Sequence, residues 1–132
     1  MATGQYLLKM GKVMRGIRGA ITVDENTTQA IGVAAQKLVE AMLTANNNLA
    51  IEDIVSVLFT VTSDLNSAFP ATAVREIAGF SQVPMMCALE IDVPGSLRRC
   101  IRVLMLVNTC MGPSEIKHVY LGDAARLRPD LI

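Results

Sequence analysis

The stretch VPMMCALEIDVPGSLRRCIRVLMLV, residues 83–107, contains two apolar runs separated by a Pro-Gly turn. This pattern predicts two strands, over residues 83–92 and 97–107, that form an antiparallel hairpin. Each predicted strand carries a charge among apolar neighbours, Glu90 in the first and Arg102 in the second. A buried charge destabilises a fold unless it is paired or meets a ligand, so both residues mark a candidate site.

On either side of this stretch, the chain alternates predicted strands and helices. Thr27 or Asn26 supplies a helix N-cap, and Pro70 is well placed to open a second helix. We expect an α+β fold of α/β-like character, a mixed sheet with its helices largely on one face. The other expected elements are strands over residues 13–23, 54–61 and 117–121 and helices over residues 27–45 and 71–78.

Length and composition predict a single domain in the cytoplasm. The chain has 132 residues, of which 52% are hydrophobic and 18% charged, a balance that favours a sizeable core and self-association. Twelve basic residues balance twelve acidic ones, so no overall field favours nucleic acid or an anionic membrane. The apolar runs are too short to span a membrane, and the first twelve residues lack the apolar core of a signal peptide. We interpret residues 1–12 as an N-terminal extension and residues 13–132 as one domain.

Several common chemistries have no motif in this sequence. Its one histidine, His118, has no His, Cys or acidic partner at ligand spacing, so no metal site is predicted. A lone histidine of this kind is more often a surface or packing residue. Phosphate loops and the nucleophile elbow G-x-S-x-G are also absent from the sequence. The three cysteines show no C-x-x-C spacing, which favours reduced thiols.

The remaining candidates are polar groups on predicted strands: Arg18, Glu90, Arg102 and Tyr120, with Cys87 three residues before Glu90. Two arginines, a carboxylate and a phenol suit an anionic ligand that is held by charge and orientation. The alternative is that Glu90 and Arg102 pair across the hairpin as a buried structural ion pair. The residues themselves leave both interpretations open.

Short motifs in a fixed order connect these candidates to a known family. They are RGIRGA at 15–20, FPA at 69–71 with AVRE at 73–76, VP at 83–84, Cys87 with Glu90, CIRV at 100–103, HVYL at 118–121 and LRPD at 127–130. Through them, the chain resembles the monofunctional chorismate mutases of the Bacillus class from residue 14 to residue 132. The resemblance implies a homotrimeric pseudo-α/β-barrel with three active sites between subunits. It also implies the conversion of chorismate to prephenate, towards phenylalanine and tyrosine, with no cofactor and no covalent intermediate.

The same resemblance implies roles for individual residues. Arg102 is the cation aimed at the ether oxygen, and Arg18 binds the side-chain carboxylate. Glu90 and Cys87 hold the ring hydroxyl. The remaining implied substrate contacts are Tyr120 beside Arg18, Phe69 lining the cleft, Leu127, and Arg75 and Arg128 near the mouth of the cleft.

Two other functions are compatible with a trimer that holds an arginine in an intersubunit cleft. One is an imine or enamine deaminase, against which the combination of Cys87, Glu90 and Arg102 argues. The other is a non-enzymatic anion sensor, which could lose Arg102, whereas this chain keeps it. The sequence departs from the best-known family members at Thr72, where they carry a lysine, so one peripheral cation is missing.

Overall fold

The computed structural model describes residues 11–131, which form one five-stranded mixed sheet with two α-helices. This confirms the predicted α+β class. The strands are β1 (Val13–Thr22), β2 (Ile54–Val61), β3 (Met85–Leu89), β4 (Cys100–Thr109) and β5 (Val119–Leu121), and the helices are α2 (Thr28–Ala45) and α3 (Pro70–Val74). Short 3₁₀ helices lie at Ile51–Asp53, Phe80–Gln82, Gly122–Leu127 and Pro129–Leu131.

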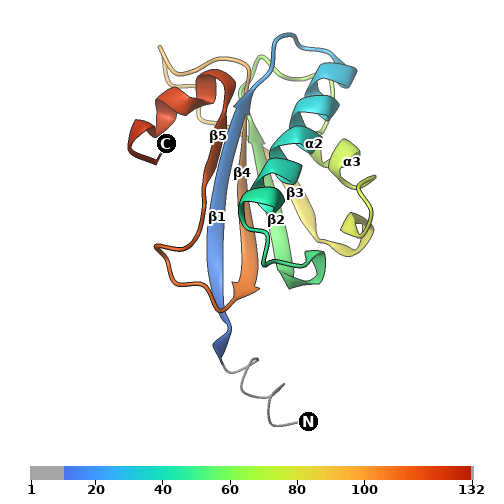
Figure 1. The fold of residues 1–132 in the computed structure, drawn as a ribbon. Coiled ribbons are helices and arrows are strands. Elements are labelled where there is room, and N and C mark those ends of the chain that lie inside the picture. The colour runs from blue at the N-terminus through green and yellow to red at the C-terminus, as the bar shows by residue number, and fades with distance from the viewer. Residues whose placement is uncertain (1–10, 132) are drawn as a thin grey trace.

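The strand order in the sheet is β3-β2-β4-β1-β5. The central strand β4 runs antiparallel to both of its neighbours, β1 and β2, whereas the outer strands β3 and β5 run parallel to β2 and β1. Both α-helices lie against one face of this sheet, as Figure 1 shows. We call the opposite face, which carries neither α2 nor α3, the open face.

The predicted hairpin between residues 83–92 and 97–107 is wrong. β3 pairs with β2 in parallel, from Val57↔Met85 to Val61↔Leu89, and β4 lies on the other side of β2. The Pro-Gly turn exists, but it belongs to a segment that passes from β3 over the end of β2 to β4. In the centre of the sheet, the long apolar strand β4 forms hydrogen bonds along both edges, which a hairpin at the edge of the sheet would not provide.

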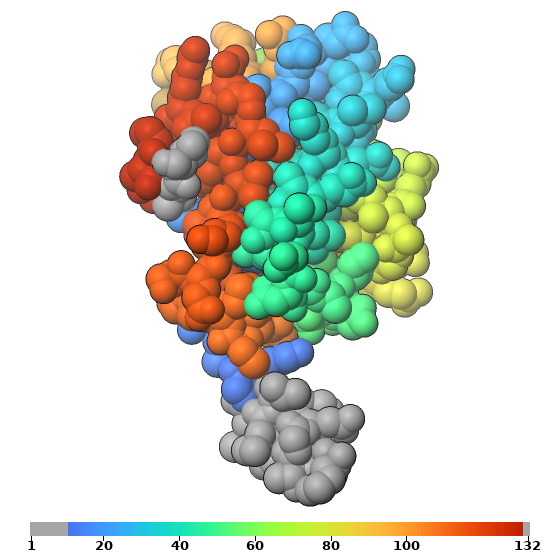
Figure 2. All heavy atoms as spheres, viewed as in Figure 1, coloured from blue at the N-terminus to red at the C-terminus, as the bar shows by residue number. Residues whose placement is uncertain are grey.

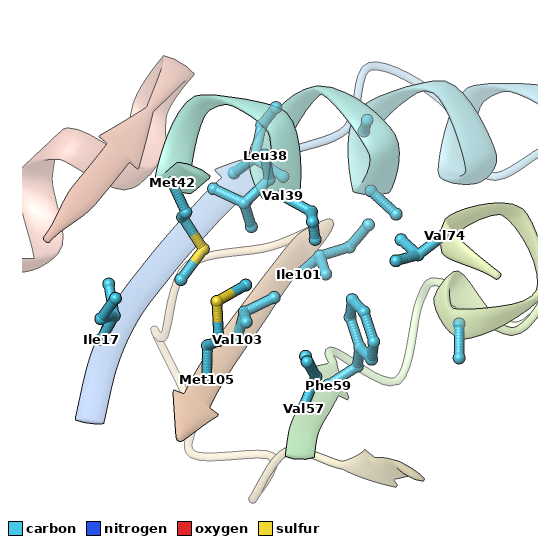
Figure 3. Close-up of a cluster of buried hydrophobic side chains, with 14 of the residues drawn as sticks. Ile17, Leu38, Val39, Met42, Val57, Phe59, Val74, Ile101, Val103 and Met105 are labelled. Carbon is cyan, nitrogen blue, oxygen red and sulfur yellow. The ribbon is translucent and has the colours of Figure 1, made fainter. Parts of the chain in front are cut away.

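The core lies between α2 and the sheet. Thr27 caps the helix through its side-chain oxygen, which accepts a hydrogen bond from the Ala30 N–H at 3.1 Å. The buried side of α2 then faces β1, β2 and β4 (Figure 3). At Gly19 the helix comes so close that an added Cβ would lie 2.5 Å from the Met42 Sδ. The buried residues of α2 are Ile31, Ala34, Ala35, Leu38, Val39 and Met42.

Several elements are shorter than predicted, among them β3, which spans Met85–Leu89 rather than residues 83–92. α3 ends at Val74 rather than at residue 78, and the chain turns before Gly79, whose φ of 91° is left-handed. This turn brings Phe80 into the core, where it is fully buried. β5 begins at Val119 rather than at residue 117. Of the predicted extension, residues 1–10 lie outside the described residues, and Lys12 forms an ion pair with Asp53 at 3.1 Å.

Candidate active site

A row of paired residues crosses all five strands on the open face. Tyr120 pairs with Ala20, Ala20 with Arg102, Arg102 with Thr60, and Thr60 with Ala88. Side chains alternate along a strand, and both neighbours of Arg102 in β4 are buried beneath the helices. The row therefore places Arg102 near the middle of the open face, with Tyr120 two strands away.

Arg102 forms an ion pair with Glu90 across the intervening strand β2. Glu90 follows β3 directly, and its N–H donates to the Val61 carbonyl at 2.9 Å. The Arg102 Nε lies 3.0 Å from the Glu90 Oε1, and the two side chains are 47% and 24% exposed. The predicted pairing is thus present, but the pair is neither buried nor part of a hairpin. A pair this exposed contributes at most about 1 kcal/mol, so an anionic ligand can compete with the carboxylate for the guanidinium.

Arg18 lies in the neighbouring row of the same face. It pairs with Leu104, and Leu104 pairs in turn with Leu58. Because Arg18 is two residues from Ala20, it is a diagonal neighbour of Arg102, at a Cα separation of roughly 7–8 Å. Two guanidinium groups thus lie on one face, and the phenol of Tyr120 is next to Ala20.

The C-terminal segment covers the Tyr120 end of the row. Ala20 is buried together with Cys100 and Ala124, and Tyr120 and Leu127 pack against this small cluster. Arg128 follows directly, and its guanidinium makes a two-pronged contact with Asp130, Nη2 to Oδ2 at 2.8 Å and Nε to Oδ1 at 3.0 Å. Leu127 and Arg128 therefore lie near Tyr120.

Phe69 and Cys87 lie on the opposite side of the sheet. Cys87 pairs with Phe59, whose side chain is fully buried under the helices, and Cys87 itself packs against that core. Phe69 and Cys87 line a groove of about 470 Å³ together with Leu89. Phe69 is 70% exposed, and Arg75 is exposed where α3 ends. We call Arg18, Glu90, Arg102 and Tyr120 the charged group, and Phe69 and Cys87, which line the groove, the groove group. Arg75 does not line the groove.

Comparison with known proteins identifies the family to which the chain belongs. The profile of type I chorismate mutases matches residues 14–131. The chain belongs to the type I chorismate mutase family. The chorismate mutase of Thermus thermophilus is 54% identical over 119 residues, which cover 90% of this chain and 97% of that protein. The Bacillus subtilis (strain 168) enzyme is 44% identical over 119 residues, 90% of this chain and 93% of its own length.

A solved chorismate mutase structure, from Clostridium thermocellum, has the same fold. It superimposes with a TM-score of 0.81 at 50% sequence identity, over 85% of this chain and 98% of that one. The family resemblance inferred from the motifs is thus confirmed, as is the prediction that the chain is a chorismate mutase, an isomerase of aromatic amino acid biosynthesis.

Other chemistries find no support in the part of the chain that the structure describes. Within residues 11–131, no group of three His, Cys, Asp or Glu side chains is arranged to hold a metal ion. Burial raises the pKa of the Cys100 thiol to about 11, an effect that the nearby Arg102 opposes but does not cancel. Cys100 therefore remains protonated at neutral pH and is not an activated nucleophile. No described helix is long and apolar enough to cross a bilayer.

Several polar residues around this candidate site were not anticipated from the sequence. Thr60 lies between Arg102 and Ala88, and its hydroxyl is buried without a hydrogen-bond partner. Asp64 accepts the N–H of Arg99 at 3.0 and 3.1 Å and so holds the left-handed backbone, φ 47°, that precedes β4. In the sequence, Thr60 and Asp64 are visible only as polar residues at the end of an apolar strand. Polar residues at this position also fit an ordinary loop. His118, assigned to surface or packing, accepts a backbone hydrogen bond from Arg18.

Proposed function

We propose that the chain converts chorismate to prephenate in a homotrimer, at sites that each combine the charged group of one subunit with the groove group of the next. The observation behind this proposal is the Arg102–Glu90 pair on an open sheet face, with Arg18 in the adjacent row. Phe69 and Cys87 lie on the other side of the same sheet. Within one subunit, the sheet itself separates the two groups, so a second copy has to bring them together.

The reaction needs orientation and charge rather than a proton shuttle. Within one molecule, a C–C bond forms between the enolpyruvyl methylene and the ring as the ether C–O bond breaks. No proton, electron or group passes to the protein, in keeping with the proposed absence of a cofactor. Holding the compact conformer of the dianion can contribute several kcal/mol. The protein therefore needs fixed cations and a shaped wall, and the two groups can supply them.

Arg102 is the centre of the proposed mechanism. Negative charge grows on the ether oxygen as the bond breaks, and a cation aimed at that oxygen stabilises the transition state more than the substrate. The ion pair with Glu90 holds the guanidinium over the open face before substrate arrives. In the complex, the proposed roles are an ether contact for Arg102 and a contact between Glu90 and the ring hydroxyl.

The other residues bind the rest of the dianion. Arg18 is proposed to hold the side-chain carboxylate, with Tyr120 donating to the same region, because Tyr120 lies in the Arg102 row and Arg18 lies in the adjacent row of the open face. From the next subunit, Cys87 would meet the ring hydroxyl and Phe69 would line the cleft. The proposed contacts at the mouth are Arg75, Leu127 and Arg128, of which Arg75 is the most exposed.

Exposed apolar side chains support the trimer. On the open face, Leu58 is 38% exposed, Leu104 40% and Met86 71%. Beside the groove, Phe69 and Leu89 are also largely exposed. Such patches are typical of protein interfaces. When two different surfaces of one chain meet head to tail, the contacts can close into a ring, which is how a homotrimer would use both. A cytoplasmic location completes the proposal.

The direct test is to mix the purified chain with chorismate and follow the loss of its absorbance, with prephenate identified as the product. The proposal expects rapid conversion without added metal or cofactor, and a trimer by size-exclusion chromatography with light scattering. If a folded trimer left chorismate unchanged, the catalytic part of the proposal would fail and the anion-sensor alternative would gain support. If the active species were a monomer, the shared sites would be ruled out.

A further inference from the structure

His118, which has no predicted metal-ligating partner in the sequence, accepts a hydrogen bond from the backbone of Arg18. Arg18 is one of the residues proposed to bind the substrate. The Arg18 N–H donates to the His118 Nδ1 at 2.9 Å. His118 immediately precedes β5, whose parallel pairing with β1 begins at Gly19↔Val119. The imidazole thus extends the contact between β5 and β1 by one residue, at the position of Arg18. Because β5 has only three residues, this bond adds to a short strand pairing.

The histidine is itself anchored from the helix layer. Asn46 caps the C-terminal end of α2 and is 2% exposed. Its side-chain amide forms hydrogen bonds with both backbone groups of Lys117, the residue before His118. Its Nδ2 donates to the Lys117 carbonyl at 2.9 Å, and its Oδ1 accepts the Lys117 N–H at 2.9 Å. In Figure 2 the segment that leads into β5 lies directly against the end of α2. Lys117 and His118 together therefore link the end of α2 to β1, and Tyr120 follows two residues after His118.

We propose that His118 is a positioning residue whose neutral imidazole fixes Arg18 relative to Tyr120, so that protonation of the Nδ1 loosens the substrate carboxylate site. This inference rests on the proposed roles of Arg18 and Tyr120. This role differs from ordinary packing because the hydrogen bond requires an acceptor at the Nδ1. A protonated Nδ1 would present a second donor to the Arg18 N–H, and the contact would become repulsive.

The surroundings of His118 keep it neutral. Its pKa is lowered from the ordinary value by partial burial first and then by the positive charges of Arg18 and Arg128. The guanidinium of Arg128 is itself paired with Asp130, and α2 contributes the uncharged Asn46 at this point. The bond is therefore intact at neutral pH and is lost only as the pH falls through the pKa of His118, which lies below the ordinary histidine value of about 6.5.

The test distinguishes the effect of losing the hydrogen-bond acceptor from the effect of changing the side-chain volume at position 118. In His118→Asn the amide oxygen can take the place of the Nδ1 and does not titrate, whereas His118→Phe keeps a ring but has no acceptor. Lys117→Ala is the matched control, because only the backbone of Lys117 is used. For each trimeric variant, kcat and KM for chorismate are measured from pH 5 to pH 8.

At pH 7.5, His118→Phe is expected to lose about 10-fold to 100-fold in kcat/KM, because small displacements of a ligand-holding group have effects of this size. His118→Asn should stay within about threefold of the native chain, and Lys117→Ala should match it. Below pH 6.5, kcat/KM of the native chain should fall more steeply than that of His118→Asn. Equal losses in the Asn and Phe variants, or superimposable pH profiles of the native chain and His118→Asn, would overturn the inference.

A measurement without substrate separates this inference from the proposed function. Hydrogen exchange of the Arg18 amide, followed by NMR, should be slow in the native chain and in His118→Asn and fast in His118→Phe. Slow exchange in all three would contradict the bond whatever the activity. If the native chain left chorismate unchanged while the exchange pattern held, the proposed function would fail and the bond would stand, although its role in substrate binding would fail too.

Discussion

The guanidinium of Arg102 meets the carboxylate of Glu90 at 3.0 Å across the strand that separates them. Neither residue is buried, so the pair adds little to the stability of the fold. Its effect is on orientation, because it fixes a cation on the open face beside Arg18. The energy of the pair is small enough to be exchanged for a substrate contact, as the proposed role of Arg102 requires.

Replacing Arg102 with Ala should therefore affect the rate far more than the fold. We expect kcat/KM to fall by at least about 100-fold, since loss of one preorganised donor to a developing oxyanion has that effect. Urea unfolding should show a loss of less than about 1 kcal/mol. Arg98→Ala, which removes an exposed arginine near the turn, is the matched control and should leave the rate unchanged. Undiminished turnover in Arg102→Ala would reject its role, and a large loss of stability in both Arg102→Ala and Glu90→Ala would make the pair structural.

Gly19 should be needed for the fit between β1 and α2. In Gly19→Ala the new methyl group would lie about 2.5 Å from the Met42 Sδ and 3.2 Å from the Leu38 Cδ1, so the helix or these side chains must move. Overpacking of this kind destabilises by about 1–3 kcal/mol. Thermal and urea unfolding measure the loss, and a double-mutant cycle with Met42→Ala should show coupling of at least about 0.5 kcal/mol. Additive effects of the two substitutions would mean that the contact with Met42 is not the cause.

The free energy of unfolding should fall at alkaline pH because the Cys100 thiol is buried. Its pKa is about 11 in the folded chain, against an ordinary value of 9.0. Between these values the unfolded chain loses the thiol proton and the folded chain keeps it, so the unfolded chain binds fewer protons and stability falls as the pH rises. The loss is on the order of 2 kcal/mol by pH 11. Cys100→Ala should show a correspondingly shallower decline in unfolding free energy, and equal slopes would contradict the assignment.

Local signals were sufficient for much of the fold. The predicted second strand, residues 54–61, coincides with β2, and the predicted first helix matches α2 with Thr27 as its cap. Apolar spacing and capping residues lie within the elements themselves, so the sequence displays them. The strand that pairs with β3 could not be predicted in this way, because the pairing depends on a crossover of residues 62–84 that brings β3 beside β2. A Pro-Gly turn between two apolar runs gives no indication of that choice.

The candidate site could likewise be predicted only in part, from its local features. Single charges in apolar runs drew attention to Glu90 and Arg102, and the structure brings them together. The separation of Cys87 from Arg102 depends on the pairing of Cys87 with Phe59. The bonds that anchor Lys117 and His118 join residues 71 and 100 positions apart. Such long-range contacts leave no periodic pattern in one sequence.

Subunit complementation tests the central claim most directly. Arg102→Ala disables the charged group, and Phe69→Asp places a negative charge on the exposed groove group, so each homotrimer should be nearly inactive. If the two variants are unfolded, mixed in equal amounts and refolded together, a site formed between subunits finds two intact halves about one time in four. We predict recovery of roughly a quarter of the native specific activity. Refolded mixed trimers that remain as inactive as either parent would show that each site lies within one chain.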